Sequence, residues 1–108
     1  MSITAGQIFK QEIYLDNDKT GEPIGSDLVA DIDLRLSTDR SKELGKYNVA
    51  SGITKVSDGR FLITIPETDT LKLKDYIGDN ATLEGYLLPC KKPIIIDLGA
   101  VLNNKAND

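Results

Sequence analysis

The chain has 108 residues, of which 40% are hydrophobic and 28% are charged, and its net charge is −4. This length supports one domain with a single modest core, and the acidic balance argues against nucleic acid as a partner, because phosphate binding needs clustered Lys and Arg. No apolar run approaches the roughly 20 residues of a membrane span, and the N-terminal residues lack the pattern of a secretory signal. We therefore expect a protein that is made in a cytosol, stays there unless a larger assembly carries it out, and binds no membrane.

The first predicted strand is Ile8–Leu15, in which apolar Phe9, Ile13 and Leu15 alternate with polar residues. The preceding residues, 1–7, are expected to form an N-terminal arm or an edge extension. The following segment, Asp16–Ser26, is dense in Asp, Asn, Gly and Pro, which are the residues that turns select. It therefore predicts a loop between two strands.

Asp27–Ser37 carries the clearest alternation in the chain. Its apolar positions are Leu28, Ala30, Ile32, Leu34 and Leu36, and its polar positions are Asp31, Asp33, Arg35 and Ser37. A helix would wrap the charges around the same cylinder and leave no clean apolar stripe. The period of two predicts a strand with one buried face.

The next residues predict short elements. Thr38–Lys46 is polar, with one helical turn expected at Ser41–Leu44 before Gly45. Tyr47–Val56 is expected to hold one or two short strands, broken at residues 51–52. An Asp-Gly pair at residues 58–59 then indicates a hairpin leading into Arg60–Ile65.

That hairpin strand places Phe61, Ile63 and Ile65 in the core, and Pro66 ends it because proline cannot donate to a strand ladder. Glu67–Gly78 is ambiguous between a short strand and a crossing segment with one helical turn. We favour the crossing segment, with Leu73 and Ile77 packed against the core.

Two strands complete the prediction, Asn80–Leu88 and Ile94–Leu102, joined by a turn at residues 89–93. The polar residues 103–108 are expected to be a flexible C-terminal tail. Residues 8–102 thus form a single all-β domain. Six or more short strands with turns between them predict a β-sandwich or a small barrel.

The sharpest candidate metal site is the Asp16–Asp27 loop. Asp16, Asp18, Thr20 and Asp27, with Gly21 between them, approach the ligand spacing of a calcium loop. Pro23 and the flanking strands do not fit that motif, so an ordinary turn is favoured and no metal or cofactor is predicted.

Catalytic candidates are weak. Cys90 is the only cysteine and the chain contains no histidine, so neither an activated thiol nor a usual zinc set is indicated. Asp31 and Asp33 share one strand face, where solubilising charge is the favoured interpretation. We therefore predict no catalytic residues and no enzyme.

The last strand supplies the predicted contact residues. Its triple isoleucine places apolar side chains on both faces, which indicates a central position in the sheet or coverage by a partner. Because exposed strand edges pair readily, the predicted interface residues are Ile94, Ile95, Ile96 and Val101.

The order of turns and strands carries a resemblance over residues 8–102. It runs from DNDKTGEPI (residues 16–24) through the alternating strand at 28–36 and the hairpin into FLITIP (61–66) to Gly85-Tyr86 and a terminal apolar strand. This order resembles the small immunoglobulin-like β-sandwich domains of tailed-phage virions, notably the N-terminal domain of baseplate upper proteins. The polar Thr38–Tyr47 insertion and the Leu71–Lys74 run depart from that pattern.

The resemblance implies an immunoglobulin-like antiparallel β-sandwich of about seven strands with one short helical turn. It also implies a non-enzymatic structural protein of a phage or prophage virion, in a tail, baseplate, decoration or head-completion position. Such a protein binds other virion proteins or copies of itself, as a homo-oligomer. The alternative is a small binding module that holds a peptide, a glycan or calcium through loops at one end of the sandwich, such as Asp16–Ser26 and Thr38–Lys46.

Overall fold

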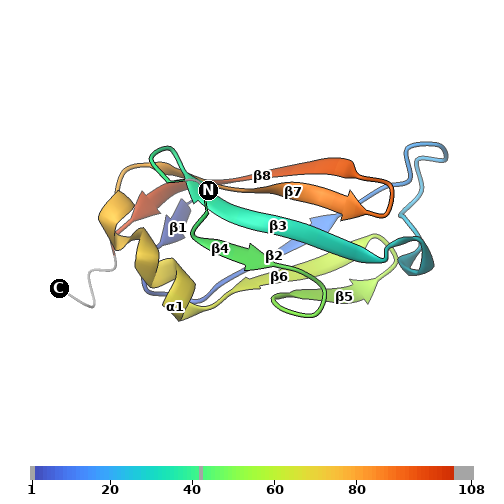
Figure 1. Ribbon diagram of the computed structural model, residues 1–108. Coiled ribbons are helices and arrows are strands. Elements are labelled where there is room, and N and C mark those ends of the chain that lie inside the picture. The colour runs from blue at the N-terminus through green and yellow to red at the C-terminus, as the bar shows by residue number, and fades with distance from the viewer. Residues whose placement is uncertain (1, 42, 104–108) are drawn as a thin grey trace.

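The computed structural model describes residues 2–41 and 43–103, which fold into two β-sheets packed face to face (Figure 1). The strands are β1 (Ser2–Thr4), β2 (Phe9–Tyr14), β3 (Asp31–Thr38), β4 (Gly45–Tyr47), β5 (Ile53–Ser57), β6 (Arg60–Ile65), β7 (Asn80–Leu88) and β8 (Lys92–Leu102). The helical segments are η1 (Ser26–Leu28), α1 (Glu67–Thr70) and η2 (Leu71–Tyr76).

The first sheet has five strands in the order β1-β8-β7-β3-β4, and the second has three in the order β2-β6-β5. Every pair is antiparallel except β1 with β8, which is parallel. The predicted all-β sandwich is confirmed, and the described strands form two separate sheets rather than a small barrel. The described residues hold eight strands instead of about seven, because β1 adds a short edge strand.

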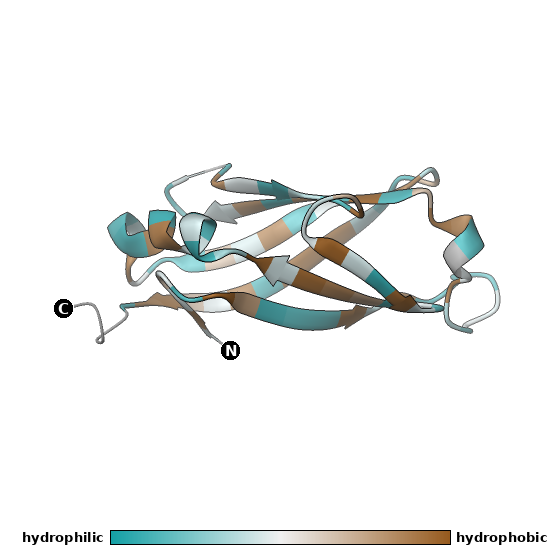
Figure 2. Cartoon of the chain, turned by 90° about the horizontal axis from the view of Figure 1, so that it is seen from below, coloured by the Kyte–Doolittle hydropathy of each residue, from teal (hydrophilic) through white to brown (hydrophobic). Residues whose placement is uncertain are grey.

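The core lies between the two sheets and is made by alternate residues of their strands. Figure 2 shows apolar and polar residues alternating along the strands. The fully buried side chains include Ile32, Leu34, Leu36, Leu83, Leu87 and Leu98 from the five-stranded sheet and Ile53, Phe61, Ile63 and Ile65 from the other. The predicted burial of the alternating residues Ile32, Leu34 and Leu36 in β3 and Phe61, Ile63 and Ile65 in β6 is therefore confirmed.

The start of β3 differs from the prediction. Leu28 and Ala30, expected on the buried face, are both exposed, with Leu28 at 54%, whereas Val29 is buried. The reason is η1, a turn of 3-10 helix that changes the direction of the chain before the strand begins at Asp31. Ser37, expected in solvent, is buried because its neighbours in β7 cover it.

The first strand pairs with the end of the last one. Ser2–Thr4 lies beside Ala100–Leu102, so the described part of residues 1–7 is an edge extension rather than an arm. Ile3 and Ala5 are buried in the core. Of the predicted tail, 103–108, only Asn103 is described, and the rest lies outside the described residues.

Of two predicted connections, one is corrected and one is confirmed. Thr38 and Ser41 exchange backbone hydrogen bonds and the Leu44 N–H donates to Leu36 O at 2.7 Å, so the described residues around 41–44 form a β-type connection instead of a helical turn. The hairpin at residues 58–59 is confirmed by the β5–β6 pair, but of its two central residues only Gly59 has a positive φ, of 71°.

The crossing segment is confirmed as helical and is longer than expected. It consists of α1 followed by η2, and it carries the chain from β6 in one sheet to β7 in the other. Leu73 is fully buried as predicted, whereas Ile77 is 42% exposed because it lies just past the end of η2. No helix within residues 2–41 and 43–103 has the length and apolar character needed to span a bilayer.

Candidate functional site

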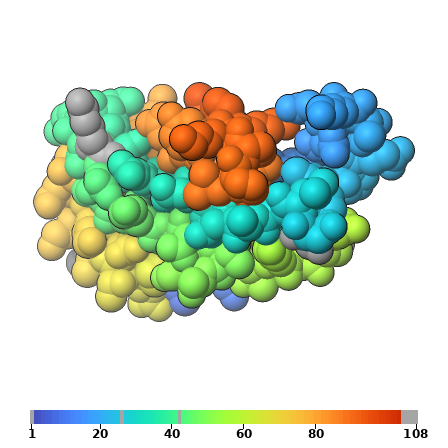
Figure 3. All heavy atoms as spheres, turned by 45° about the vertical axis from the view of Figure 1, so that its right-hand side comes forward, coloured from blue at the N-terminus to red at the C-terminus, as the bar shows by residue number. Residues whose placement is uncertain are grey.

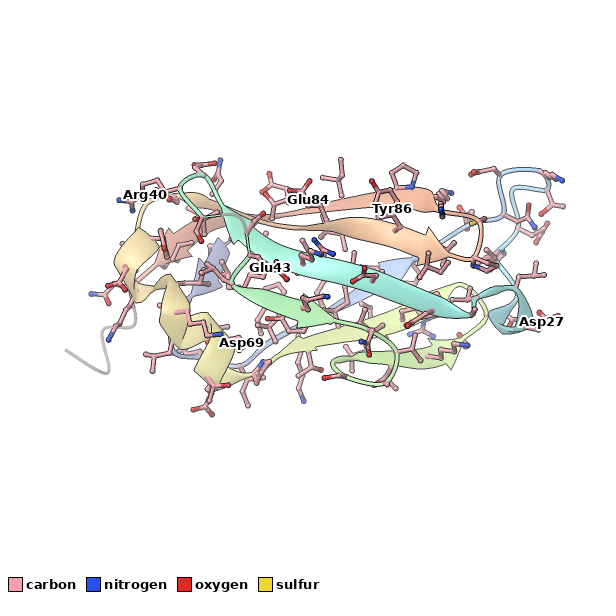
Figure 4. All side chains as sticks on the ribbon, in the orientation of Figure 1. Asp27, Arg40, Glu43, Asp69, Glu84 and Tyr86 are labelled. Carbon is pink, nitrogen blue, oxygen red and sulfur yellow. The ribbon has the colours of Figure 1, made fainter. Side chains whose placement is uncertain are left out.

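The candidate site is the side of the five-stranded sheet that faces away from the other sheet. We call it the β3–β7–β8 face, and it comprises Asp33, Arg35 and Ser37 of β3, Glu84 and Tyr86 of β7, and Pro93 and Ile95 of β8. Glu84 and Tyr86 project from β7 away from the three-stranded sheet (Figure 4). These side chains line an open groove of about 620 Å³.

Strand register arranges this face in rows across the sheet. Arg35 lies opposite Glu84, which lies opposite Ile95, and the adjacent row contains Asp33, Tyr86 and Pro93. The period of two that buries Leu34, Leu83 and Ile94 necessarily turns their sequence neighbours outward. Tyr86 and Ile95 therefore lie in adjacent rows on the outward side, where they are 52% and 73% exposed.

The charged side chains of the β3–β7–β8 face form few interactions within the chain. Although Arg35 and Glu84 are opposite each other, no ion pair joins them, and within the described residues neither Arg35 nor Asp33 has an acidic or basic partner. The Ser37 hydroxyl donates to Glu84 Oε1 over a long 3.5 Å. This face therefore presents both charge signs to solvent.

The outward side of the three-stranded sheet is different. On this β2–β6 face, the Arg60 guanidinium donates to both carboxylate oxygens of Glu12, at 2.9 and 3.0 Å, and lies 5.9 Å from the centre of the Tyr14 ring. The Tyr14 hydroxyl also donates to Glu12, at 3.0 Å. The hydrogen bonds from Arg60 and then Tyr14 lower the pKa of the Glu12 carboxyl. Glu12 and Arg60 on this face are thus paired within the chain.

A glycine allows the close approach of the strands beneath the candidate site. A Cβ atom on Gly85 would collide with the backbone carbonyl oxygen of Asp33 on β3. Because Gly85 lies between Glu84 and Tyr86 and points inward, any side chain there would push β7 away from β3. The close pairing of β3 and β7 beneath the outward rows thus depends on the absence of a side chain at this position.

The predicted interface residues are only partly available. Ile94 and Val101 are buried in the core, and Ile96 packs against it. Alternation turns Ile94 and Ile96 to the same side, and the register shift between residues 97 and 99 brings Val101 to the inside as well. Of the four, Ile95 alone is strongly exposed. The expectation that Ile94 and Val101 contact a partner is corrected.

Sequence reasoning missed Tyr86, Arg35 and Glu84 as members of one surface. The sequence prediction gave Tyr86 no place on a surface, yet Leu83 and Leu87 are buried and the bulky side chain one residue from Leu87 must point outward. That alternation could have identified Tyr86. The grouping with Arg35 and Ile95 depends on the pairing of β7 with β3 and β8, for which the sequence alone carries no register signal.

The candidate calcium loop is held by protein groups. The Lys92 ammonium donates to Asp18 Oδ1 at 2.7 Å and to Asp16 O at 3.3 Å, and Thr20 Oγ1 accepts from the Glu22 N–H. Asp27 lies apart in η1. Figure 3 shows this loop, in blue, projecting at one end of the molecule. Across 2–41 and 43–103, no three His, Cys, Asp or Glu residues are placed to hold a metal ion.

The other sequence candidates are dispersed. The Asp31 carboxylate accepts the backbone N–H groups of Ile32 and Val49 at 2.8 and 2.9 Å, so it fixes the β4–β5 connection. Cys90 is exposed in the β7–β8 turn. The loops 16–26 and 38–46 precede and follow β3, and they therefore lie at opposite ends of the sandwich (Figure 1), which corrects their predicted grouping at one end.

One buried polar pair lies on the inner side of β4. The Tyr47 hydroxyl donates to Asp69 Oδ2 at 2.8 Å and joins β4 to α1. Burial, followed by the hydrogen bond to Asp69, raises the pKa of the Tyr47 phenol well above its ordinary value. Lys72 lies 3.6 Å from the other Asp69 oxygen, at the exposed side. The arrangement fastens the crossing segment to the five-stranded sheet.

Comparison with known protein families, curated proteins and solved structures finds no match to this chain. The resemblance to phage immunoglobulin-like domains therefore stays a prediction.

Proposed function

We propose that the protein is a non-enzymatic contact module that binds other proteins through the β3–β7–β8 face. The observation that carries this proposal is the combination, on one sheet face, of exposed Tyr86 and Ile95 with charges that have no ionic partner among the described residues. Aromatic and apolar residues surrounded by polar groups are typical of protein–protein interfaces. A single exposed apolar residue would carry no such meaning.

The chemistry of the groove supports contact rather than catalysis. Within the described part of the groove, the Ser37 hydroxyl donates a hydrogen bond to the Glu84 carboxylate over 3.5 Å. A serine nucleophile needs a base within about 2.6–3.2 Å to take its proton, and the Glu84 carboxylate lies beyond that reach. Ser37 is therefore poorly suited to nucleophilic attack.

We propose further that the chain is a structural component of a phage or prophage virion, made in the host cytoplasm and then incorporated into the particle. The support is the sequence resemblance, together with a sandwich in which β2 and β6 share one sheet and β7 and β8 share the other, as in immunoglobulin-like domains. Symmetric particles repeat each contact many times, so a small face is sufficient for stable incorporation.

Mass spectrometry of particles purified from the host strain tests this proposal. The wild-type chain is expected at a fixed stoichiometry relative to other particle proteins. The variant with both Tyr86→Ala and Ile95→Ser is expected to be lost from the particles, because it removes the exposed apolar group.

Tyr14→Ala is the matched control, since Tyr14 is a similarly exposed tyrosine on the β2–β6 face, at 67%. This variant should be incorporated as the wild type is. Absence of the wild-type chain from the particles contradicts the virion assignment. Normal incorporation of the double variant contradicts the assignment of the face.

A further inference from the structure

We infer that the β3–β7–β8 face binds the same face of a second copy of this chain, which makes the protein a two-fold symmetric dimer. The inference rests on the proposed function and names the partner of that surface. It comes from the order of charges in one row of the sheet. Lys46 of β4, Arg35 of β3, Glu84 of β7 and Ile95 of β8 follow one another across the sheet in register.

A two-fold axis parallel to the strands, between β3 and β7, makes this row self-complementary. The axis places β3 of one copy over β7 of the other, so that Arg35 meets Glu84 of the second copy. Symmetry repeats the pair, and Lys46 then lies over Ile95 of the second copy. Each basic side chain thus finds an acidic or apolar group that lacks a strong partner within its own chain.

The neighbouring row fits the same axis. Asp33 and Tyr86 are cross-strand partners in one copy, and the two-fold axis places Asp33 over Tyr86 of the second copy. A phenol can donate a hydrogen bond to that carboxylate while its ring covers the apolar centre. The two adjacent rows are therefore both complementary about the same two-fold axis.

Charge also distinguishes this arrangement from the alternatives. An axis running across the strands through the central row would place Arg35 over Arg35 and Glu84 over Glu84, which is repulsive. The face carries Arg35 against Asp33 and Glu84, so it lacks the single sign that would select a strongly acidic or basic foreign partner. A second copy pairs Arg35 with Glu84 twice, once on each side of the axis.

The dimensions agree with a reversible dimer. Strands β3, β7 and β8, taken at about eight residues each, and the three-residue β4 give a face of about 430 Å² at about 4.8 Å between strands and about 3.3 Å per residue. Two such faces bury about 860 Å² in total, an area typical of weak, transient interfaces. Packed sheets lie about 10 Å apart, a gap that Arg35 and Glu84 can bridge. We therefore expect a weak dimer that dissociates readily on dilution.

Charge-reversal variants, measured by analytical ultracentrifugation, test this geometry directly. Arg35→Glu and Glu84→Arg should each weaken self-association about 100-fold, because each leaves like charges facing across the interface. An equimolar mixture of the two variants should form a heterodimer of near wild-type affinity, since the introduced carboxylate at position 35 then meets the introduced guanidinium at position 84. Lys10→Glu makes a charge change of the same size on the β2–β6 face and should leave the dimer intact.

A dilution series of the ¹⁵N-labelled wild-type protein provides a measurement that needs no variant. Amide shifts that depend on concentration should fall in β3, β4, β7 and β8 and be absent from β2, β5 and β6. A wild-type monomer at millimolar concentration overturns the dimer while leaving the proposed contact with other virion proteins untouched. The assigned face is overturned if both charge reversals leave the affinity of the dimer unchanged. It is also overturned if the concentration-dependent amide shifts lie in the three-stranded sheet.

Discussion

The outward faces of the two sheets differ in how their charged side chains are satisfied. On the β2–β6 face, Arg60, Glu12 and Tyr14 form a closed group of hydrogen bonds and a ring contact. On the β3–β7–β8 face, Arg35 and Glu84 are directly opposite but form no ion pair, and apolar Tyr86 and Ile95 lie beside them. The Arg60–Glu12–Tyr14 group is complete within one chain, whereas Arg35 and Glu84 form no ion pair within it, which is why we propose a partner for the second face.

The same contrast exists within β3 itself, and core truncation tests it with the largest expected effect. Leu34 is fully buried and Arg35 is exposed. Leu34→Ala is expected to lower the free energy of unfolding by about 3 kcal/mol through lost burial and the cavity left behind. Arg35→Ala should change it by less than about 0.5 kcal/mol. Urea denaturation measures both, and equal losses would contradict the division of β3 into a structural and a binding side.

Gly85 connects the two sides of β7, and its substitution should have the next largest effect. Gly85→Ala is expected to cost about 2–3 kcal/mol, because its Cβ meets the Asp33 carbonyl oxygen and forces the strands apart. Gly21→Ala is the control: its Cβ meets nothing within 4 Å, but its φ of 72° costs about 1 kcal/mol. Thermal melts of the two variants should separate them, and an unchanged midpoint for Gly85→Ala would show that β3 and β7 are not so close.

Tyr47 tests whether the inner side depends on a polar pair as well as on apolar packing. Tyr47→Phe should cost about 1–2 kcal/mol near neutral pH, because it removes a hydrogen bond to a carboxylate. The phenol pKa is raised in the folded protein, so its contribution is complete below the unfolded value of about 10 and declines as the pH rises above it.

Denaturation of both proteins between about pH 8 and about pH 11 checks this sign, because the range spans the unfolded phenol pKa. The difference between wild type and Tyr47→Phe should be constant up to about pH 10 and then shrink. A difference that grows with pH would mean that the folded protein favours the ionised phenol.

The smallest expected change in stability is on the β3–β7–β8 face. Ile95→Thr keeps a β-branched residue in an exposed strand position and should alter the free energy of unfolding by less than about 0.5 kcal/mol. The same variant should weaken binding at this face, since Ile95 contributes much of its exposed apolar surface. Equilibrium unfolding and sedimentation of one preparation measure both effects, and a stability loss without weaker association would assign Ile95 to the fold.

Alternation along individual strands made most of the fold predictable. The burial of Ile32, Leu34 and Leu36, and of Phe61, Ile63 and Ile65, followed from a period of two. Alternation failed at Leu28, because η1 turns the chain there and the pattern continues in the sequence beyond the strand. The alternation in the sequence does not indicate at which residue a strand begins or ends its pairing.

The candidate site was much less predictable than the core. Ile95 was identified, but Ile94 and Val101 were assigned to the same surface although they are buried. The groups that define the surface come from three strands separated by long stretches of sequence, and only the register of β3, β7 and β8 brings them together. The sequence near a polar residue does not indicate which residue lies opposite it across a sheet.

Photocrosslinking from two matched tyrosine positions tests the difference between the faces most directly. Benzoylphenylalanine replaces Tyr86 in one protein and Tyr14 in another, and both are irradiated during particle assembly. We expect specific protein adducts from position 86, including the chain dimer, and only background from position 14. Adducts from position 14 with none from position 86 would contradict the assignment of the β3–β7–β8 face as the binding surface.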